Sequence, residues 1–102
     1  MEYTKKITLC EVGLRDGLQS EKSSLSTDQK VELANDVVKA GFQVIELGSF
    51  VSPKAVPQMA DTDEVFRRLP KYDGVEYRAL IANLRGVDRA AECGCKKVKL
   101  NV

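Results

Sequence analysis

The chain has 102 residues, of which 43% are apolar and 30% are charged, enough for one small domain and too few for several. Its formal charge of +1, from 16 basic and 15 acidic residues, excludes recruitment of nucleic acid or an anionic membrane by a net electrostatic field. Histidine is absent, so an active site that depends on imidazole cannot be complete within this chain.

The first predicted strand covers residues 7–12, which are mainly β-branched or apolar and end at Gly13. Residues 26–29, Ser-Thr-Asp-Gln, form a capping-box pattern that predicts the start of a helix, and apolar residues then recur at helical spacing as far as Gly41. The second predicted strand follows at once, over residues 42–47. The two strands are therefore expected to be parallel, with the helix crossing between them.

A shorter helix is predicted next, with Asp61 and Glu64 as a second capping box and Pro70 as its end. The remaining predicted elements are a strand over residues 75–82, a helix over residues 84–93 that closes at Gly94, and a strand over residues 97–102. Strands that alternate with helices indicate a parallel sheet with right-handed crossovers.

Two architectures fit this order of elements. One is a free-standing, doubly wound sheet, and the other is the first part of a (β/α)8 barrel, which needs about 250 residues in all. An apolar strand at residues 97–102 would leave unpaired backbone groups at an open edge of a free-standing sheet, which favours the barrel. We therefore predict an α/β fold of parallel βα repeats: the first four strands and three helices of a (β/α)8 TIM barrel. Residues 1–102 would form the N-terminal half of that domain, truncated after the fourth strand.

Targeting signals and disulfides are not indicated by the sequence. No segment is apolar for long enough to cross a bilayer, and the first residues lack the apolar stretch of a secretory signal. Three cysteines, an odd number, favour reduced thiols, and Cys10 is expected to be a small core residue. Cys93 and Cys95 supply too few ligands for a tetrahedral metal site and are interpreted as packing at a helix end. We expect a cytoplasmic protein with no membrane or nucleic-acid partner.

The loops after the first two strands carry the candidate site, because ligands of parallel α/β folds bind where the strands end. The first loop places Arg15 beside Asp16, between Gly13 and Gly17. An aspartate there is a hard oxygen ligand for Mg²⁺ or Mn²⁺, and a guanidinium can hold a carbonyl or carboxylate oxygen as negative charge builds on it. Residue types alone favour the simpler alternative, a solvated turn with a surface ion pair.

Glu46 is unusual because it lies between Ile45 and Leu47 in an apolar strand that should be buried on both faces. An unpaired carboxylate there would be costly. Neighbouring parallel strands end about 5 Å apart, so pairing of Glu46 with Arg15 is geometrically easy. The alternative partner is an unrelated lysine. The loop of residues 48–61 that follows is long and contains two prolines, which suits a binding loop as well as a packed surface flap.

Two separated motifs resemble the 3-hydroxy-3-methylglutaryl-CoA lyase family. They are residues 11–22, Glu-Val-Gly-Leu-Arg-Asp-Gly-Leu-Gln-Ser-Glu-Lys, and residues 44–61, which include Ser-Phe-Val-Ser-Pro-Lys. Residues 82–86 also resemble the third strand-to-helix junction of that family, so the resemblance spans nearly the whole chain. The wider group of metal-dependent TIM-barrel lyases and Claisen-type synthases shares the Arg-Asp pair and the strand-two glutamate. The Gly-Leu-Gln and Ser-Phe-Val-Ser-Pro-Lys segments point to the lyases.

The resemblance implies cleavage of an acyl-CoA substrate, 3-hydroxy-3-methylglutaryl-CoA, to acetyl-CoA and acetoacetate, a step of leucine degradation and ketone-body formation. By the same resemblance, Asp16 ligates a divalent cation, Mg²⁺ or Mn²⁺. Arg15 stabilises the developing enolate, and Glu46 orients Arg15. The resemblance also places Gln19 and Ser49 where they are expected to line the substrate pocket.

Part of the family pattern has no counterpart in this sequence. The family completes its metal site with two histidines and an asparagine from later strands, and it uses a cysteine on a mobile loop whose context Cys93 and Cys95 do not match. Leu14 stands where the family commonly has proline, and Ala55 where tryptophan is frequent, which should affect loop stiffness and packing more than chemistry. The chain alone is therefore expected to be inactive.

Two other hypotheses remain. A non-catalytic half-barrel module would pair through its last strand with another copy or with a complementary half-barrel. A fragment of a related Claisen-type synthase or aldolase would carry the same Arg-Asp pair and act on a different substrate.

Overall fold

The computed structural model describes residues 8–19 and 25–100, which form a four-stranded parallel sheet in the order β1-β2-β3-β4. The strands are β1 (Cys10–Glu11), β2 (Val44–Ser49), β3 (Glu76–Ile81) and β4 (Lys97–Leu100). The helices between them are α1 (Thr27–Lys39), α2 (Thr62–Arg68) and α3 (Leu84–Glu92). Two short helical turns, η1 (Gly13–Gly17) and η2 (Pro57–Met59), follow β1 and β2. The predicted order of strands and helices is confirmed.

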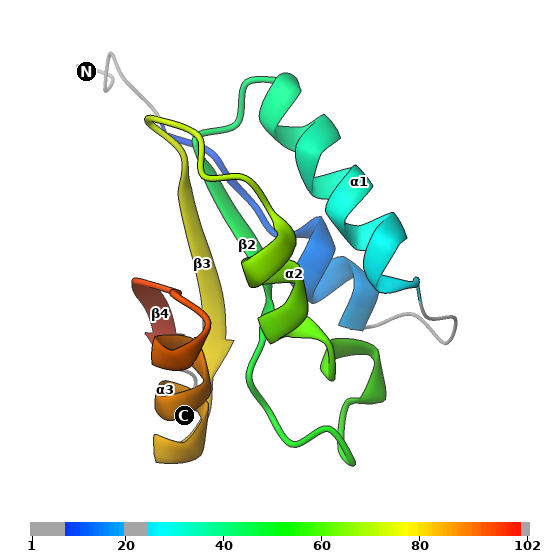
Figure 1. The fold of residues 1–102 in the computed structure, drawn as a ribbon, viewed down its shortest axis with the longest axis vertical. Helices are drawn as coiled ribbons and strands as arrows, with labels where there is room; N and C mark the ends of the chain where they lie inside the picture. The colour runs from blue at the N-terminus through cyan, green and yellow to red at the C-terminus, as the bar shows by residue number, and fades with distance from the viewer. Residues whose placement is uncertain (1–7, 20–24, 101–102) are drawn as a thin grey trace, which may run out of the picture.

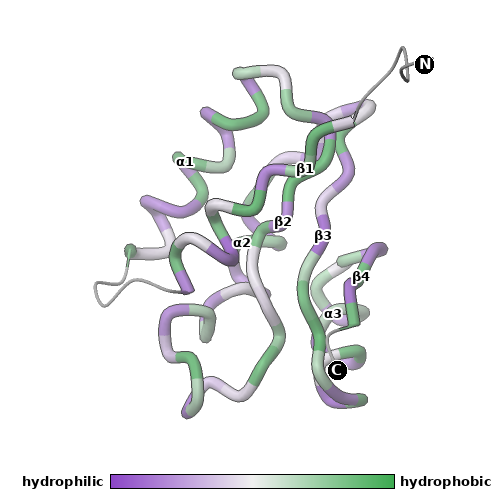
Figure 2. The backbone as a smooth tube through the Cα atoms, turned by 180° about the vertical axis from the view of Figure 1, so that it is seen from behind, coloured by the Kyte–Doolittle hydropathy of each residue, from purple (hydrophilic) through white to green (hydrophobic). Residues whose placement is uncertain are grey.

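All three helices lie on the same face of the sheet (Figure 1), and the view from behind looks onto the strands (Figure 2). Ala34 of α1, Phe66 of α2 and Ala90 of α3 belong to one apolar core with Ile45 and Ala79 of the sheet. A doubly wound sheet carries helices on both faces, whereas a barrel carries them on the outer face only. The structure therefore agrees with the predicted part of a TIM barrel. Within the described residues, no helix has the length and apolar character that crossing a membrane would require.

The strands differ from the predicted ranges at their ends. Among the described residues of the predicted range 7–12, β1 covers Cys10–Glu11, and it pairs with the start of β2, where Cys10 faces Val44. Residue 7 lies outside the described part of the chain. The core position expected for Cys10 is wrong: this residue is exposed, since β1 is an edge strand. At the other edge β4 ends at Leu100, and the last two residues of its predicted range lie outside the described part of the chain.

The capping box predicted at the start of α1 is confirmed. The backbone N–H of Gln29 donates to Ser26 Oγ at 3.1 Å, and the backbone N–H of Ser26 donates to Gln29 Oε1 at 2.9 Å. The second predicted capping box is wrong. Asp61 does precede α2, but its side chain makes no capping hydrogen bond, because its carboxylate is bound by Thr27 and Lys30 of α1.

A bulge in β2 decides which side chains share a face of the sheet. The register of β2 against β3 shifts between Glu46 and Gly48, so that Glu46 pairs with Arg78 and Ser49 pairs with Leu80. Arg78 and Leu80 are two residues apart, and side chains at that spacing in a strand point to the same side. Glu46 and Ser49 therefore share the face opposite the helices, although residues three apart in a regular strand point to opposite faces.

Gly48 lies at this bulge, directly under α2. A Cβ atom at Gly48 would lie 2.4 Å from Oγ1 of Thr62, and this hydroxyl is held by a 2.8 Å hydrogen bond to the carbonyl of Met59. We expect Gly48→Ala to lower the free energy of unfolding by about 1–3 kcal/mol, measured by chemical denaturation. Gly17→Ala is the matched control, because its added Cβ would meet no described atom within 4 Å. A Gly48→Ala chain as stable as the control would contradict this packing.

Candidate active site

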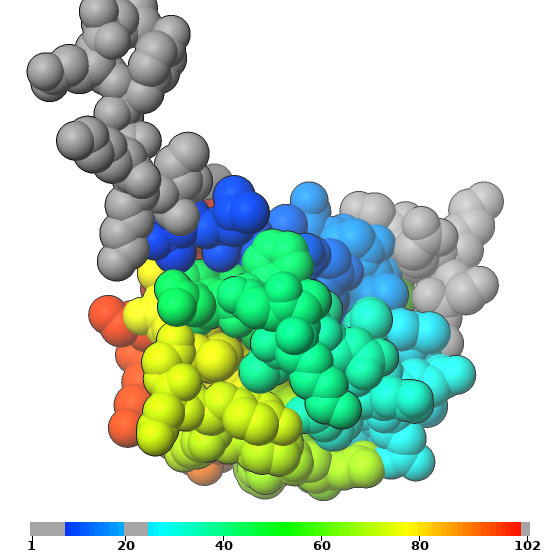
Figure 3. Space-filling view, turned by 90° about the horizontal axis from the view of Figure 1, so that it is seen from above, coloured from blue at the N-terminus to red at the C-terminus, as the bar shows by residue number. Residues whose placement is uncertain are grey.

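The candidate site lies at the edge of the sheet where the strands end. Figure 3 looks onto the opposite end, where the segments that lead into β2 and β3 lie side by side, in green and yellow. There the backbone N–H of Glu76 donates to the carbonyl of Gln43 at 2.7 Å. The loops at the site edge are η1, after β1, and residues 50–61, named here the β2–α2 loop.

An ion pair between Arg15 and Glu46 joins the ends of β1 and β2. Arg15 Nε donates to Glu46 Oε1 at 2.5 Å, and the two side chains are 14% and 3% exposed. A carboxylate this deeply buried needs a cation and a directed hydrogen bond, and a guanidinium supplies both. The pairing predicted from strand geometry is confirmed. The partner of Glu46 is Arg15 and not the lysine considered as the alternative.

The turn η1 fixes the position of Arg15. The carbonyl of Val12 accepts hydrogen bonds from the backbone N–H groups of Arg15, Asp16 and Gly17, at 3.1, 2.7 and 3.4 Å. Leu14 is buried in the core, so the turn is anchored on one side while Arg15 reaches Glu46. Leu14, which stands where the resembled family commonly has proline, therefore acts in packing, as expected.

Asp16 lies at the open rim of this site. Its side chain is 64% exposed, and its carboxylate lies 3.6 Å from the terminal nitrogen Nη1 of Arg15. An exposed carboxylate at this edge suits one ligand position of a hard divalent cation. Residues 8–19 and 25–100 contain no group of three or more potential metal-ligating side chains, so they fit a contribution to a metal site and not a whole one.

Gln19 and Ser49, the predicted substrate-lining residues, contact each other. Ser49 Oγ donates to Gln19 Oε1 at 3.4 Å, and Ser49 is fully buried whereas Gln19 is partly exposed. Gln58 of the β2–α2 loop joins them, because its Nε2 donates to the Gln19 carbonyl at 3.3 Å. Their role in substrate binding stays a prediction. Residues 20–22 of the motif lie outside the described residues.

Sequence reasoning missed Lys30 and its partner Asp61. Lys30 lies in α1, is 4% exposed and binds the carboxylate of Asp61, the residue that precedes α2. One signal was available: Lys30 lies four residues before Ala34, on the face of α1 that is buried.

The Cys-x-Cys pair has the packing role predicted for it. Cys93 is buried and its Sγ donates to the carbonyl of Ala90 at 3.4 Å. Burial raises the pKa of the Cys93 and Cys95 thiols above their ordinary value. Both thiols therefore stay protonated near neutral pH, which disfavours nucleophilic and metal-ligating roles.

Comparison with known proteins gives consistent matches along nearly the whole chain. Residues 6–102 match the family model described as HMGL-like. The 3-hydroxy-3-isohexenylglutaryl-CoA/hydroxy-methylglutaryl-CoA lyase of Pseudomonas aeruginosa is 50% identical over 98 residues, which cover 96% of this chain and 33% of the relative. The mitochondrial hydroxymethylglutaryl-CoA lyase of Macaca fascicularis is 48% identical over 96 residues, which cover 94% of this chain and 30% of the relative.

A solved structure gives the same match. An HMG-CoA lyase from Acinetobacter baumannii, in complex with coenzyme A and 3-methylmalate, superposes with a TM-score of 0.88 at 43% identity. The match covers 91% of this chain and 30% of that one. The chain thus spans about a third of the length of the relatives it matches.

Proposed function

The chain belongs to the HMGL-like family, and on this basis we propose that it is the N-terminal part of a TIM-barrel hydroxymethylglutaryl-CoA lyase. The reaction would be cleavage of 3-hydroxy-3-methylglutaryl-CoA to acetyl-CoA and acetoacetate, a step of leucine degradation and ketone-body formation. The observation that carries the proposal is the buried Arg15–Glu46 pair with Asp16 beside it, at the edge where the strands end.

The reaction breaks the bond between C2 and C3 of the acyl group. The proton of the C3 hydroxyl leaves as the ketone of acetoacetate forms, and the electrons of the broken bond pass to the thioester as an enolate. Protonation of C2 then gives acetyl-CoA, so the atoms balance without a second reactant. Arg15 would stabilise the enolate oxygen, because a fixed guanidinium favours a site where negative charge develops.

Glu46 would keep Arg15 in position for this role. The donor groups of the Arg15 guanidinium are divided between Glu46, which accepts from Nε, and the rim at Asp16, whose carboxylate lies 3.6 Å from Nη1. Their fixed, planar geometry suits a thioester or carboxylate oxygen of the substrate. Gln19 and Ser49, on the same side of the sheet, are the candidates for further contacts with the acyl group.

Asp16 would hold a divalent cation, Mg²⁺ or Mn²⁺. Such a cation supplies Lewis-acid polarisation of a substrate oxygen when it is bound. The exposed carboxylate fits one ligand position, and we assign the other ligands to parts of the enzyme beyond the described residues.

The substrate partner is proposed to be an acyl-CoA, supported by the coenzyme A complex of the Acinetobacter relative. The cytoplasmic location stays a prediction from the sequence, and the Macaca relative is named as mitochondrial. Pairing with a second copy or with a complementary half-barrel also stays a prediction.

A hybrid enzyme tests the proposed function. Residues 6–102 of this chain would replace the matched segment of the Pseudomonas aeruginosa lyase. With Mg²⁺ or Mn²⁺, we expect the hybrid to convert 3-hydroxy-3-methylglutaryl-CoA to acetoacetate and acetyl-CoA, each quantified directly. The chain alone is expected to show no turnover, because Asp16 is its one proposed metal ligand. Condensation of acetyl-CoA with a 2-oxo acid, in place of cleavage, would contradict the lyase and support the synthase alternative.

A further inference from the structure

Lys30 of α1 is buried, which is unusual because lysine ordinarily keeps its ammonium in water. The ammonium donates hydrogen bonds to the backbone carbonyl of Gln58 and to the carboxylate of Asp61. Both partners belong to the β2–α2 loop. A buried cation has to be compensated by such contacts, so the position of Lys30 and the conformation of this loop depend on each other.

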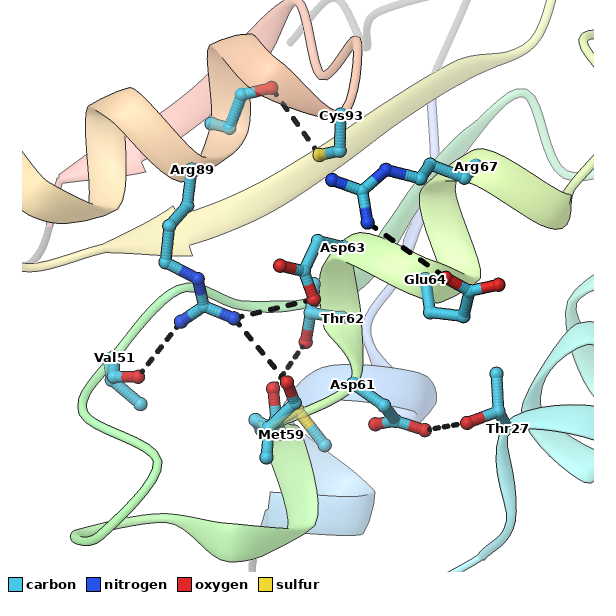
Figure 4. A network of polar contacts seen from close by, with 12 residues as sticks. Thr27, Val51, Met59, Asp61, Thr62, Asp63, Glu64, Arg67, Arg89 and Cys93 are labelled. Atoms are coloured by element: carbon cyan, nitrogen blue, oxygen red, sulfur yellow. Dashed lines mark hydrogen bonds and ion pairs between the residues drawn. The ribbon is translucent and has the colours of Figure 1, made fainter.

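Two further side chains, Thr27 and Arg89, hold the same loop through three hydrogen bonds (Figure 4). Thr27 Oγ1, one turn before Lys30, donates to the second carboxylate oxygen of Asp61 at 2.6 Å. From the other side, the guanidinium of Arg89 in α3 donates to the carbonyls of Val51 at 3.3 Å and Ala60 at 3.4 Å. Because several acceptors are backbone carbonyls, these contacts fix the path of the loop and not only its side chains.

The end of the loop held by Lys30 leads directly to the candidate site. The backbone of Gln58 is bound by Lys30, and the side chain of Gln58 donates to the carbonyl of Gln19. The side-chain oxygen of Gln19 in turn accepts a hydrogen bond from the hydroxyl of Ser49. Gln58 therefore connects the buried ammonium to the residues proposed to line the substrate pocket.

We propose that Lys30 is a positioning residue for substrate binding: it fixes Gln58 and Asp61, and through Gln58 it sets the position of Gln19 and Ser49. The inference rests on the proposed function, since it assigns the β2–α2 loop to the substrate site. Without the ammonium, the Gln58 carbonyl loses a donor and the partly buried Asp61 carboxylate loses its cation. The loop then samples other conformations, and substrate affinity falls before the rate of bond cleavage does.

The first test is Lys30→Met in the hybrid enzyme, which removes the charge and keeps most of the side-chain length. We expect KM for 3-hydroxy-3-methylglutaryl-CoA to rise by about tenfold to a hundredfold, with a smaller change in kcat. Lys30→Arg, which keeps the charge, should recover most of the affinity. The matched control is Arg67→Met, which breaks an exposed 3.9 Å pair with Glu64 and should leave KM unchanged.

A second variant separates positioning from stability. Lys30→Met combined with Asp61→Asn leaves neither charge unpaired, so its unfolding temperature should return toward that of the parent hybrid while KM stays raised. If KM recovers together with the unfolding temperature, or if Lys30→Met leaves KM unchanged, Lys30 acts only in stability and the proposal is wrong.

Amide hydrogen exchange in the full chain tests the positioning role without relying on activity. Lys30→Met should speed exchange of the described segment 50–61 by about tenfold or more, relative to the other described segments. Unchanged exchange there would overturn the inference. A folded parent hybrid that does not cleave the substrate would instead contradict the proposed function, and the exchange result would then decide the role of Lys30 in fixing the loop.

Discussion

Arg15→Met in the hybrid enzyme is expected to lower kcat by about a hundredfold to a thousandfold, the usual cost of removing one fixed group that stabilises developing charge. The physical reason is the loss of the guanidinium that Glu46 holds at 2.5 Å. The same change leaves the Glu46 carboxylate, 3% exposed, without its cation. We therefore also expect the free energy of unfolding to fall by about 3–5 kcal/mol. Steady-state cleavage and chemical denaturation of the same preparations measure both effects.

Arg15→Lys is the control for charge without geometry. A lysine keeps one positive charge but lacks the planar guanidinium that binds Glu46 through Nε and that is proposed to contact a substrate oxygen. Its activity should therefore lie between those of the parent hybrid and Arg15→Met. A folded Arg15→Met hybrid with the kcat of the parent would exclude Arg15 from the chemistry.

Asp16→Asn is expected to raise the concentration of Mg²⁺ or Mn²⁺ needed for half-maximal activity by about tenfold to a hundredfold or more. An amide keeps an oxygen at this position but lacks the negative charge that a hard cation prefers. The effect on folding should be small, below about 1 kcal/mol, because the side chain is 64% exposed and its 3.6 Å contact with Arg15 is a surface pair. This variant therefore separates metal activation from stability, whereas Arg15→Met changes both activity and stability.

Titration of the hybrid with Mn²⁺, followed by activity, measures this effect. The matched control is Asp28→Asn, an equally conservative change at an exposed carboxylate that pairs with Arg68 on another part of the surface. Its metal dependence should equal that of the parent. If Asp16→Asn and Asp28→Asn give the same titration curve as the parent, Asp16 is not a metal ligand.

The sequence was sufficient for those features that depend on local pattern or on general strand geometry. The capping box at Ser26 involves residues three apart and follows from their identity. The Arg15–Glu46 pair spans 31 residues, yet it follows from two facts: neighbouring parallel strands end at the same edge, and a carboxylate inside an apolar strand needs a cation.

Features set by contacts between distant segments were not predictable in the same way. The β2 bulge, which brings Ser49 to the face of Glu46, depends on the register of β2 against β3. The local pattern of Asp61 and Glu64 predicts a helix cap, but α1 supplies stronger partners for the Asp61 carboxylate from a distant part of the chain. Cysteine is a residue type that is often buried, which favours a core position for Cys10. Its place in an edge strand leaves it exposed instead.

The most direct test of the Arg15–Glu46 pair as part of the active site is a double-mutant cycle on kcat/KM in the hybrid, with Arg15→Met, Glu46→Gln and both together. If Glu46 acts by orienting Arg15, the double variant should be no slower than Arg15→Met alone, because residues that act as a unit are not additive. Losses that multiply in the double variant would contradict this account, as would single variants that cleave the substrate as fast as the parent hybrid.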